Sequence, residues 1–342
     1  MNFPNFKLKL LLPGLLGPMP SLASSGVELE VPGIERLLAK ADRSNTSGQD
    51  YLSTLYAQFG SPNVADEDLP EGSVCYLAEG FAVEDLCCMR ADPVHLRPDR
   101  DRLLLFESGH LAIRPEEANA IAQEFNQHFA AEGMQLLTPH AERWYLRLEK
   151  CPALRTSSLF EVAGHHIETF MPSGKDARVW RQRLNETQML LFQSPVNRQR
   201  EDSGRLTING IWFSGGGRLP TLTAVTGFKV IADELNAIGL AKLAGLPSQR
   251  LADVDYSVRP AKEVCMMVWM DLVTPVMHAD PHAWAKAMQL VEGRMQNLVE
   301  SMQRQAQSCL ELYPCNGEVY TLKRSNQRRF WRRRKNMIDY LT

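Results

Sequence analysis

Residues 207–220 read TINGIWFSGGGRLP, so an apolar segment runs directly into three consecutive glycines and an arginine. Glycine has no Cβ and reaches positive φ angles easily, which lets the backbone turn sharply or approach a ligand closely. The segment predicts a buried strand that ends in a tight turn or an anion-binding loop at Gly215, Gly216, Gly217 and Arg218. The spacing is neither that of a dinucleotide-binding glycine motif nor that of a P-loop, so the glycines alone identify no ligand.

Helical and strand-like patterns alternate on both sides of this segment. Helices are expected at IERLLAKADR (34–43), DYLSTLYAQFG (50–60), ARVWRQRLNETQMLLFQ (177–193), DELNAIGLAKLAG (233–245) and from Pro281 to about Ser308. Buried strands are expected at LKLLL (8–12), VCMMVWMDL (264–272) and CLELYP (309–314). This alternation predicts an α/β fold with an open, mostly parallel sheet and helices on both faces.

The middle of the chain has a different pattern. Short strand-like runs occur at SVCYLAEG (73–80), LCCMRADPVHLR (86–97) and DRLLLFES (101–108), and a helix is expected from Arg114 to about Ala131. We therefore predict an inserted α+β domain at residues 75–175. It would divide a core formed by residues 1–74 and 176–322, and residues 323–342 would form a basic C-terminal tail.

The composition is that of an ordinary soluble globular protein. The chain has 342 residues and a formal net charge of -2, so any attraction to a polyanion must be local. Its seven cysteines lack Cys-x-x-Cys spacing, which favours reduced thiols and a cytoplasmic location. The first residues imitate a secretory signal, but Lys9 and Pro13 interrupt the apolar run and a buried strand is the preferred interpretation. No apolar run approaches the ~18 residues of a membrane span.

Several segments, taken in order, resemble a known family. They are LKLLLPGLLGP, VPGIERLLAKADR, MRADPVHLRPDRDRLLLFESGHLAIRPEEANAIAQEFN, SPVNRQREDSGRLTINGIWFSGGGRLP and DPHAWAKAMQLVEGRMQNLVESM. Together they are similar to the archaeal-type cofactor-independent phosphoglycerate mutases of the alkaline phosphatase superfamily, and more closely to a bacterial offshoot, the RpfE-type regulatory proteins. The resemblance spans most of the chain and implies an alkaline-phosphatase-like core sheet.

The resemblance also shows which catalytic groups differ. Catalytic members of the family use two divalent metals and a serine that carries the phosphoryl group, because paired cations stabilise the attacking and leaving oxygens. In this chain Pro13 stands where the family has an aspartate after the first strand. Gln49 stands where the family has the serine, if Asp50 is aligned with the aspartate that follows it.

Most of the family's later metal ligands are also absent from this chain. Asp271 matches one ligand, whereas His278 lies three positions beyond a simple match. The Asp-His pair that the family has after the next strand falls near residues 313–316, which read YPCN. Loss of ligands at several places predicts a catalytically degenerate protein with a regulatory or partner-binding role, no cofactor, and either a protein or a phosphorylated small molecule as its partner.

The alternative is an active phosphoglycerate mutase, or a metal-dependent phosphomonoesterase, with relocated ligands. It would require Mn or Zn. The candidate residues for this activity are Asp50, Ser53, Asp271, His278 and Asp280.

Arginines lie in or near the segments that the family uses around its phosphorylated substrate. They are Arg90, Arg97, Arg198, Arg218 and Arg259, and a guanidinium can hold phosphate through two parallel hydrogen bonds. A retained anion site is one interpretation, and solvated surface charge is the favoured one except at Arg218. Asn197 and Asn209 flank the same region and either cap turns or orient a ligand.

Two other groups of residues have structural explanations. His165 and His166 form the chain's one adjacent histidine pair, but neighbours on a strand face opposite sides, which disfavours a shared metal ion. Trp180, Met189, Leu190 and Phe192 fall at helical spacing and are expected to pack in the core.

The C-terminal tail contains LKRSNQRRFWRRRKN (322–336), which has no acidic residue. The cations and aromatic residue singled out here are Arg328, Arg329, Trp331, Arg332, Arg333 and Arg334. Cations interleaved with aromatic rings suit nucleic acid, anionic lipid headgroups or an acidic protein surface. A solvated or docked tail is the alternative.

Overall fold

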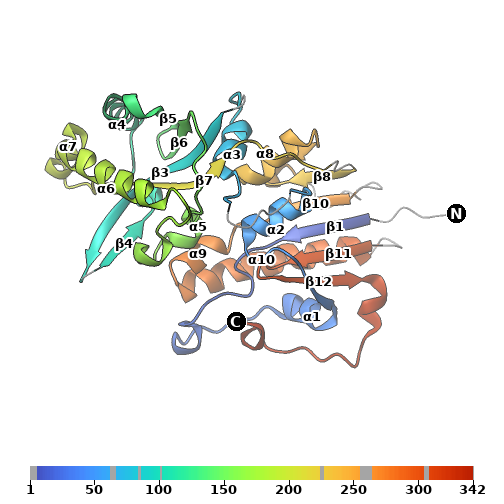
Figure 1. Ribbon diagram of the computed structural model, residues 1–342. Coiled ribbons are helices and arrows are strands. Elements are labelled where there is room, and N and C mark those ends of the chain that lie inside the picture. The colour runs from blue at the N-terminus through green and yellow to red at the C-terminus, as the bar shows by residue number, and fades with distance from the viewer. Residues whose placement is uncertain are drawn as a thin grey trace. The chain divides into compact units, whose positions relative to one another are not determined.

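The computed structural model describes residues 6–61, 67–83, 86–100, 102–223, 227–254, 264–303 and 308–341 (Figure 1). The chain forms two compact units, Met1–Pro62 with Leu222–Thr342 and Asn63–Thr221. The second unit is larger than the insert predicted from the sequence. Residues 67–74 and 176–221, predicted to lie in the core, pack with the second unit, because their glycine-rich strand joins its sheet and their helices pack within the same unit.

The described strands of the first unit form one seven-stranded sheet in the order β2-β12-β11-β1-β10-β8-β9. Their bounds are β1 Phe6–Leu11, β2 Asp42–Asn45, β8 Phe228–Ile231, β9 Ser248–Gln249, β10 Val264–Val268, β11 Ser308–Tyr313 and β12 Glu318–Lys323. Strands β11, β1, β10, β8 and β9 run parallel, and β12 and β2 are antiparallel additions. The mostly parallel sheet expected from the sequence is confirmed.

Helices cover both faces of this sheet. They are α1 (Pro32–Lys40), α2 (Tyr51–Gln58), α8 (Leu235–Leu243), α9 (Val273–Met277) and α10 (Pro281–Gln303). On one face Leu8 and Leu10 of β1 share a buried core with Ile34 of α1 and Met288 of α10. Because alternate residues of a strand point to opposite faces, Lys9 faces the other side, where its Nζ donates to Oε1 of Gln58 in α2 at 2.8 Å.

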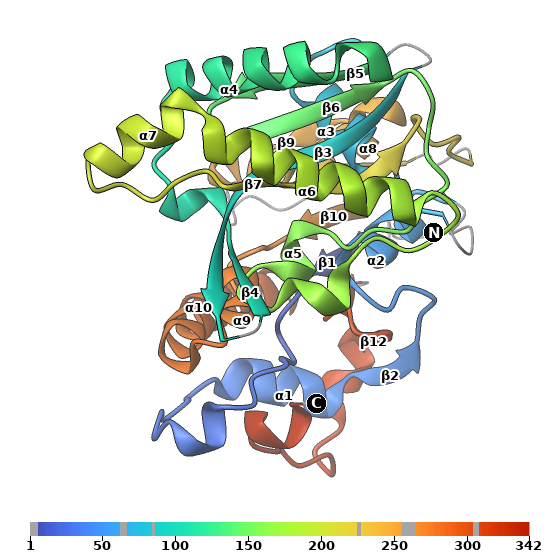
Figure 2. The ribbon, with the colours of Figure 1, turned by 60° about the vertical axis from the view of Figure 1, so that its left-hand side comes forward.

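The second unit is an antiparallel sheet with helices (Figure 2). Its strands are β3 Cys87–Asp99, β4 Arg102–Phe106, β5 Met134–His140, β6 Arg143–Leu148 and β7 Gly210–Gly217, and its helices are α3 Glu71–Ala78, α4 Pro115–His128, α5 Leu159–Val162, α6 Ala177–Gln193 and α7 Pro195–Asp202. Met89 and Ala91 of β3 share a core cluster with α4 and α6. Cys88, on the opposite face, lies beside Ser73 of α3. The predicted α+β character is confirmed.

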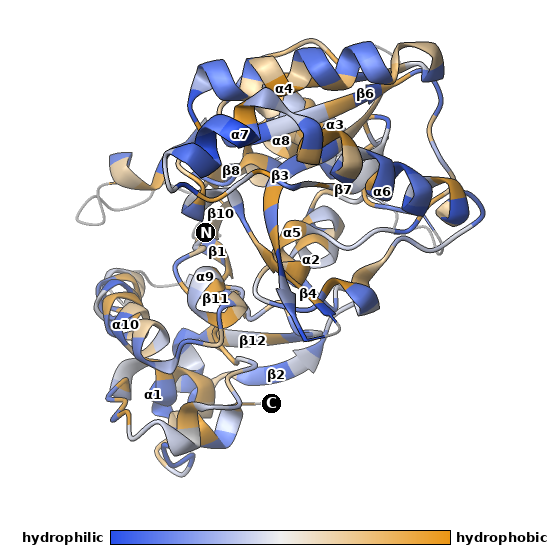
Figure 3. Ribbon diagram, turned by 90° about the vertical axis from the view of Figure 1, so that its left-hand side faces the viewer, coloured by the Kyte–Doolittle hydropathy of each residue, from blue (hydrophilic) through white to orange (hydrophobic). Residues whose placement is uncertain are grey.

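Three local expectations were wrong. Residues 73–80 were expected as a strand, but 73–78 belong to α3, because a short apolar run does not distinguish a strand from a buried helix. Helix α7 was not expected at all, and Figure 3 colours it almost entirely hydrophilic. The bounds of α6 match the expectation, but Met189 and Phe192 are 65% and 83% exposed, so they do not pack in the core.

The cysteines also differ from the expectation of seven reduced thiols. Cys87, at the start of β3, forms a disulfide with Cys151, which follows β6. Because β3 pairs with β6 and Cys87 lies opposite Leu148, the chain brings the two sulfur atoms together just beyond the strand end. The other five cysteines are free thiols. Among the described residues, no helix is long and apolar enough to cross a membrane.

Candidate functional site: the carboxyl edge of the parallel sheet

The carboxyl ends of β1, β10 and β11 meet at one edge of the first unit's sheet. Ligands of open parallel α/β sheets bind outside this edge. The segments that follow the three strands are held side by side, since the backbone N–H of Trp269 donates to Leu11 O at 3.0 Å and that of Leu12 donates to Tyr313 O at 2.9 Å. The residues that the resemblance assigns to catalysis lie on these segments or on the helices beginning near them.

Asp50 and Ser53 are both engaged in starting helix α2. Oδ1 of Asp50 accepts the backbone N–H of Ser53 at 2.8 Å, as an N-cap does. Ser53 Oγ accepts the backbone N–H groups of Gln49 and Asp50 at 3.0 and 3.2 Å, and donates to Asp50 O at 3.3 Å. Gln49, which stands in the serine position of the family, lies against the Cα of Gly317.

Asp271, the best-matched family ligand, is paired with an arginine. Its Oδ2 lies 2.8 Å from Nη1 of Arg294 on α10. The same guanidinium lies 5.8 Å from the ring centroid of Trp269, whose side chain is buried. A carboxylate paired with a guanidinium is a poor ligand for a divalent cation, because both cations would compete for the same oxygens.

Asp280 and His278 lie where α9 gives way to α10. Oδ1 of Asp280 accepts the backbone N–H groups of His282 and Ala283, each at 3.0 Å, so it caps α10. His278 is the exposed C-cap residue of α9. The end of α9 and the start of α10 thus fix where His278 and Asp280 lie. Among the described residues, neither side chain shares a cluster of metal-ligand atoms with Asp271.

Cys315 lies two residues after the end of β11, near the place where the family has its Asp-His pair. It is buried and has a φ of 64°, a left-handed conformation that few residues other than glycine adopt. Burial raises the pKa of its thiol, against a smaller lowering from a hydrogen bond with Thr54. One thiol offers a single soft sulfur ligand, so Cys315 does not replace an aspartate and a histidine. The residues present therefore do not fit a two-metal centre.

A polar layer on the α2 face of the sheet was missed by the sequence analysis. Lys7 Nζ lies 2.6 Å from Glu311 Oε1, and the hydroxyl of Tyr313 donates to Glu311 Oε2 at 3.0 Å. Burial lowers the pKa of the neighbouring Lys9, and the charge of Lys7 lowers it further. The alternation of Lys7 and Lys9 with leucines in the first strand was the available signal, since it indicates one polar and one apolar face.

The three glycines of the opening motif continue strand β7 instead of forming a turn. Gly215 has a φ of 59°, and a Cβ on it would lie 2.5 Å from Cβ of Glu71 in α3. A Cβ on Gly217 would lie 2.8 Å from Cβ of Pro70. Absence of side chains at these two positions lets the start of α3 lie directly on the strand, which gives the glycines a packing role.

The arginines named from the sequence do not converge on one place. Arg90 is paired with Asp92 on the same strand and donates from Nη1 to the hydroxyl of Tyr145 at 3.2 Å. Arg97 stacks 4.7 Å from the centroid of the Phe106 ring. Arg198 and Arg218 are exposed, with no side-chain hydrogen bond or ion pair among the described residues. Arg259 lies outside the described residues.

Both asparagine side chains form hydrogen bonds with backbone groups of the second unit. Oδ1 and Nδ2 of Asn209 bond to the backbone N–H and O of Leu96 at 2.6 and 2.9 Å, which extends the pairing of β7 with β3. Nδ2 of Asn197 donates to Leu191 O and Ile208 O at 2.8 and 2.9 Å.

The adjacent histidines His165 and His166 have separate partners. Nε2 of His166 lies 3.4 Å from Asp99 Oδ2, and Nδ1 of His165 lies 3.0 Å from Ala163 O.

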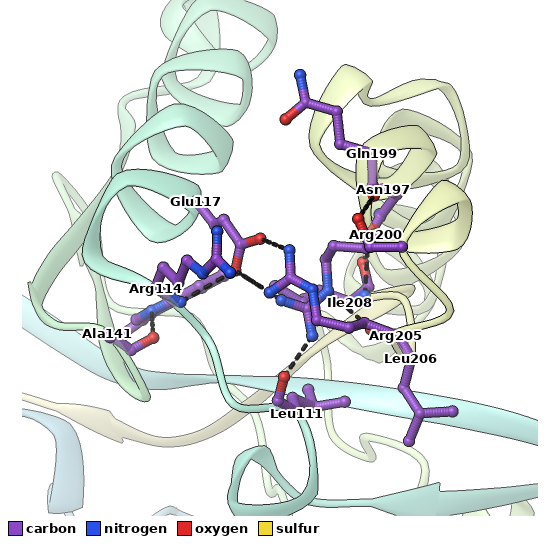
Figure 4. A network of polar contacts seen from close by, with 12 residues as sticks. Leu111, Arg114, Glu117, Ala141, Asn197, Gln199, Arg200, Arg205, Leu206 and Ile208 are labelled. Carbon is purple, nitrogen blue, oxygen red and sulfur yellow. Dashed lines mark hydrogen bonds and ion pairs between the residues drawn. The ribbon is translucent and has the colours of Figure 1, made fainter.

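A buried ion-pair network in the second unit was also missed (Figure 4). The side chain of Arg200 is fully buried and donates to Glu117 Oε2 at 2.6 Å and to Leu206 O at 2.7 Å. Arg205 bonds to the other oxygen of Glu117. Burial raises the pKa of Glu117, but the bonds from Arg205 and from the backbone of Arg114 outweigh it and lower the pKa overall. Eighty-three residues separate Glu117 and Arg200, so no short sequence window shows the pair.

Comparisons with known proteins give the class of the chain. It is 24% identical over 167 residues to the probable 2,3-bisphosphoglycerate-independent phosphoglycerate mutase of Geobacter sulfurreducens, which is 46% of this chain and 41% of that protein. It is 31% identical over 64 residues to the 2,3-bisphosphoglycerate-independent phosphoglycerate mutase of Methanosarcina mazei, which is 19% of this chain and 16% of that protein. The matches thus span less than half the length of these relatives. No protein-family model matches the chain.

The solved structure of the PH0037 protein from Pyrococcus horikoshii has a similar fold. It superposes with a TM-score of 0.56 at 13% identity, over 94% of this chain and 88% of that chain. At this identity the likeness shows the fold alone. The fold defines the class as an α/β protein with a mostly parallel central sheet and an additional antiparallel unit. Within that class, the chain is phosphoglycerate-mutase-like.

Proposed function

We propose that this chain is a catalytically degenerate phosphoglycerate-mutase-like protein, a regulatory protein of the RpfE type that acts by binding a protein partner or a phosphorylated small molecule. The proposal needs no metal or cofactor. One observation supports it above the others. At the carboxyl edge of the sheet, the carboxylates of Asp50, Asp271 and Asp280 are each already bonded to another part of the protein.

The hydroxyl groups support the same proposal. A serine nucleophile attacks through an oxygen lone pair while a base takes its proton. Ser53 has two lone pairs, and both face backbone N–H groups, while its proton is donated to Asp50 O. Using Ser53 as a nucleophile would require breaking the first turn of α2. Gln49, in the serine position of the family, has no group that could be phosphorylated.

A phosphorylated ligand remains compatible with the proposal because binding does not need the catalytic groups. Arg218 is exposed beside the glycine strand, and its guanidinium could hold a phosphate. Binding of this kind would sense a metabolite without turning it over.

The test is an activity and binding assay on the full chain. The purified protein is incubated with 2- and 3-phosphoglycerate and with an activated aryl phosphate, with and without Mn²⁺ or Zn²⁺. We expect no metal-dependent turnover above that of an Asp271→Asn variant. Turnover that requires the metal and disappears in this variant would establish the alternative, an active mutase or phosphomonoesterase.

Binding is measured separately, by the shift of the unfolding temperature with each phosphoglycerate. If the ligand is phosphorylated, the shift falls in an Arg218→Gln variant and persists in Arg178→Gln, which removes an exposed arginine of α6. If no phosphoglycerate shifts the unfolding temperature, the proposed partner is a protein. Affinity capture from a soluble lysate of the source organism then tests for that partner.

A further inference from the structure

The basic C-terminal segment is docked on the first unit and is not a free tail (Figure 1). Arg329 pairs with Asp42 at 2.5 Å, and Nη1 of Arg332 donates to Ala41 O at 2.6 Å. Met337 is buried, and its backbone N–H donates to the carboxylate of Glu35 in α1 at 2.8 Å. The turn between these anchors is therefore held in a defined conformation.

The same turn presents two aromatic rings to solvent. Phe330 is 88% exposed and Trp331 is 65% exposed. Their ring centroids lie 5.2 Å apart with an interplanar angle of 83°. Large apolar side chains exposed side by side are costly in water and often mark an interaction surface.

Other cations near the rings in the sequence take no part in the docking. Among the described residues, the side chains of Lys323, Arg324, Arg328, Arg333 and Lys335 make no hydrogen bond or ion pair, and each residue is exposed. The sequence from 319 to 338 contains no acidic residue. The partner that complements this turn must therefore carry negative charge and also accept apolar rings.

The exposure of the rings favours one kind of polyanion. Sites for single-stranded nucleic acid are positively charged grooves in which bases stack on aromatic rings. Phe330 has almost no packed face, so it projects beyond its surroundings. Aromatic rings that project among arginines and lysines are typical of residues that enter the headgroup layer of a membrane, where the cations meet lipid phosphates.

We propose that the turn 328–335 docks this protein on the surface of an anionic membrane, with Phe330 and Trp331 entering the headgroup region and Arg328, Arg333 and Lys335 contacting lipid phosphates. This is peripheral attachment and involves no membrane-spanning helix. It is independent of the function proposed for the sheet edge, because none of these residues belongs to that edge.

The strength of such docking can be stated as fold-changes. Each basic residue near an anionic bilayer contributes about fivefold in affinity at moderate ionic strength. Loss of both rings removes apolar area worth roughly tenfold or more. Attachment should be reversible and should weaken as salt is added, since the ionic part is screened.

The test is cosedimentation of the full chain with vesicles of phosphatidylcholine alone and with vesicles of phosphatidylcholine and phosphatidylglycerol in equal parts. We expect binding to the anionic vesicles only. Phe330→Ala combined with Trp331→Ala should weaken it roughly tenfold, and Arg328→Gln combined with Arg333→Gln about twentyfold. Spectrally, the tryptophan emission of the wild type should shift to the blue on binding, and most of this shift should be absent in Trp331→Phe.

Two matched controls remove the same chemistry elsewhere. Phe192→Ala deletes a phenylalanine of α6 that is 83% exposed, and Arg178→Gln deletes an exposed arginine. Both should bind anionic vesicles like the wild type. Equal losses in the controls and in the variants of the turn would overturn the proposal. A labelled single-stranded oligonucleotide is titrated in parallel, and tight, ring-dependent binding to it without vesicle binding would replace the membrane with nucleic acid.

Discussion

Glu117 and Arg200 form an ion pair in which the arginine side chain has no exposure to solvent and the two polar atoms lie 2.6 Å apart. The same carboxylate also accepts the backbone N–H of Arg114 at the start of α4 at 3.0 Å. A single side chain thus holds the first turn of α4, helix α7 and the loop after it (Figure 4). Breaking one partner of a buried pair leaves the other charge without compensation.

Glu117→Gln should therefore destabilise the second unit by about 3 kcal/mol, measured as the free energy of unfolding in urea. The matched control is Glu116→Gln, which changes an exposed neighbour and should cost less than about 0.5 kcal/mol. Because the pKa of Glu117 is lowered on folding, its stabilisation is present above the unfolded pKa and is lost as the pH falls. The variant should consequently show a weaker loss of stability in acid than the wild type.

Gly215→Ala should cost several kcal/mol, since alanine is strained at a φ of 59° and its Cβ would lie 2.5 Å from Cβ of Glu71. Gly216→Ala is the milder comparison. Gly216 has no positive φ, so alanine there meets only the contact of its Cβ with Cγ of Met89, at 2.8 Å. Thermal unfolding of both variants measures the difference. Equal, small effects would contradict the packing role that we assign to the glycines.

Asp68 should make stability depend on pH in the opposite sense to Glu117. Burial raises the pKa of this carboxyl to about 6, although Thr156 and the N–H of Gly216 donate hydrogen bonds to it. The folded state then holds the proton more tightly than the unfolded chain between about pH 4 and 6. The contribution of Asp68 to the free energy of unfolding should fall by up to about 3 kcal/mol as the pH rises through this range, and stay constant above it.

Asp68→Asn removes that titration, so its stability should vary less than that of the wild type between about pH 4 and 6. Glu67→Gln is the control, because Glu67 directly precedes Asp68 in the chain and is exposed. The measurement is urea unfolding at a series of pH values. Parallel curves for the wild type and Asp68→Asn would show that the carboxyl ionises normally.

The disulfide between Cys87 and Cys151 closes a loop with a sequence separation of 64. In the chain-entropy description, a cross-link of this length stabilises the folded state by about 4 kcal/mol. Dithiothreitol should lower the stability of the wild type to that of Cys151→Ser and leave the variant unchanged. Thiol titration of the unfolded, unreduced protein should count the five free cysteines. A count of all seven would refute the cross-link.

Much of the fold could be predicted because each element carried its own periodic signal. The apolar run of β1 and the helical spacing of α6 are local patterns, and both elements formed where they were expected. Strand β8 and helix α7 were missed. The four residues of β8 are too few to show a strand pattern. Helix α7 is almost wholly polar and shows no apolar face in the sequence, so its formation is explained by its packing beside α6 and α4.

The candidate site was harder to predict because its chemistry depends on distant partners. The sequence showed that Pro13 and Gln49 could not supply the expected groups. It could not show that Asp271 is paired with Arg294, because the two residues are brought together only by packing of α10 against the sheet edge. The packing of the glycine run could not be predicted for the same reason, since its neighbour Glu71 lies on α3, whose residues 73–78 were expected as a strand.

The docking of the C-terminal segment can be tested without reference to any ligand. Met337 is fully buried in the core cluster of the first unit, and its neighbour Ile338 is 49% exposed. Met337→Ala leaves a cavity and should lower the free energy of unfolding by about 2 to 4 kcal/mol, whereas Ile338→Ala should cost less than about 1 kcal/mol. Limited proteolysis gives a second measure, because a released segment rich in arginine becomes a good trypsin substrate. Equal resistance of the wild type and Met337→Ala, with equal stabilities, would mean that the segment is not held at this position.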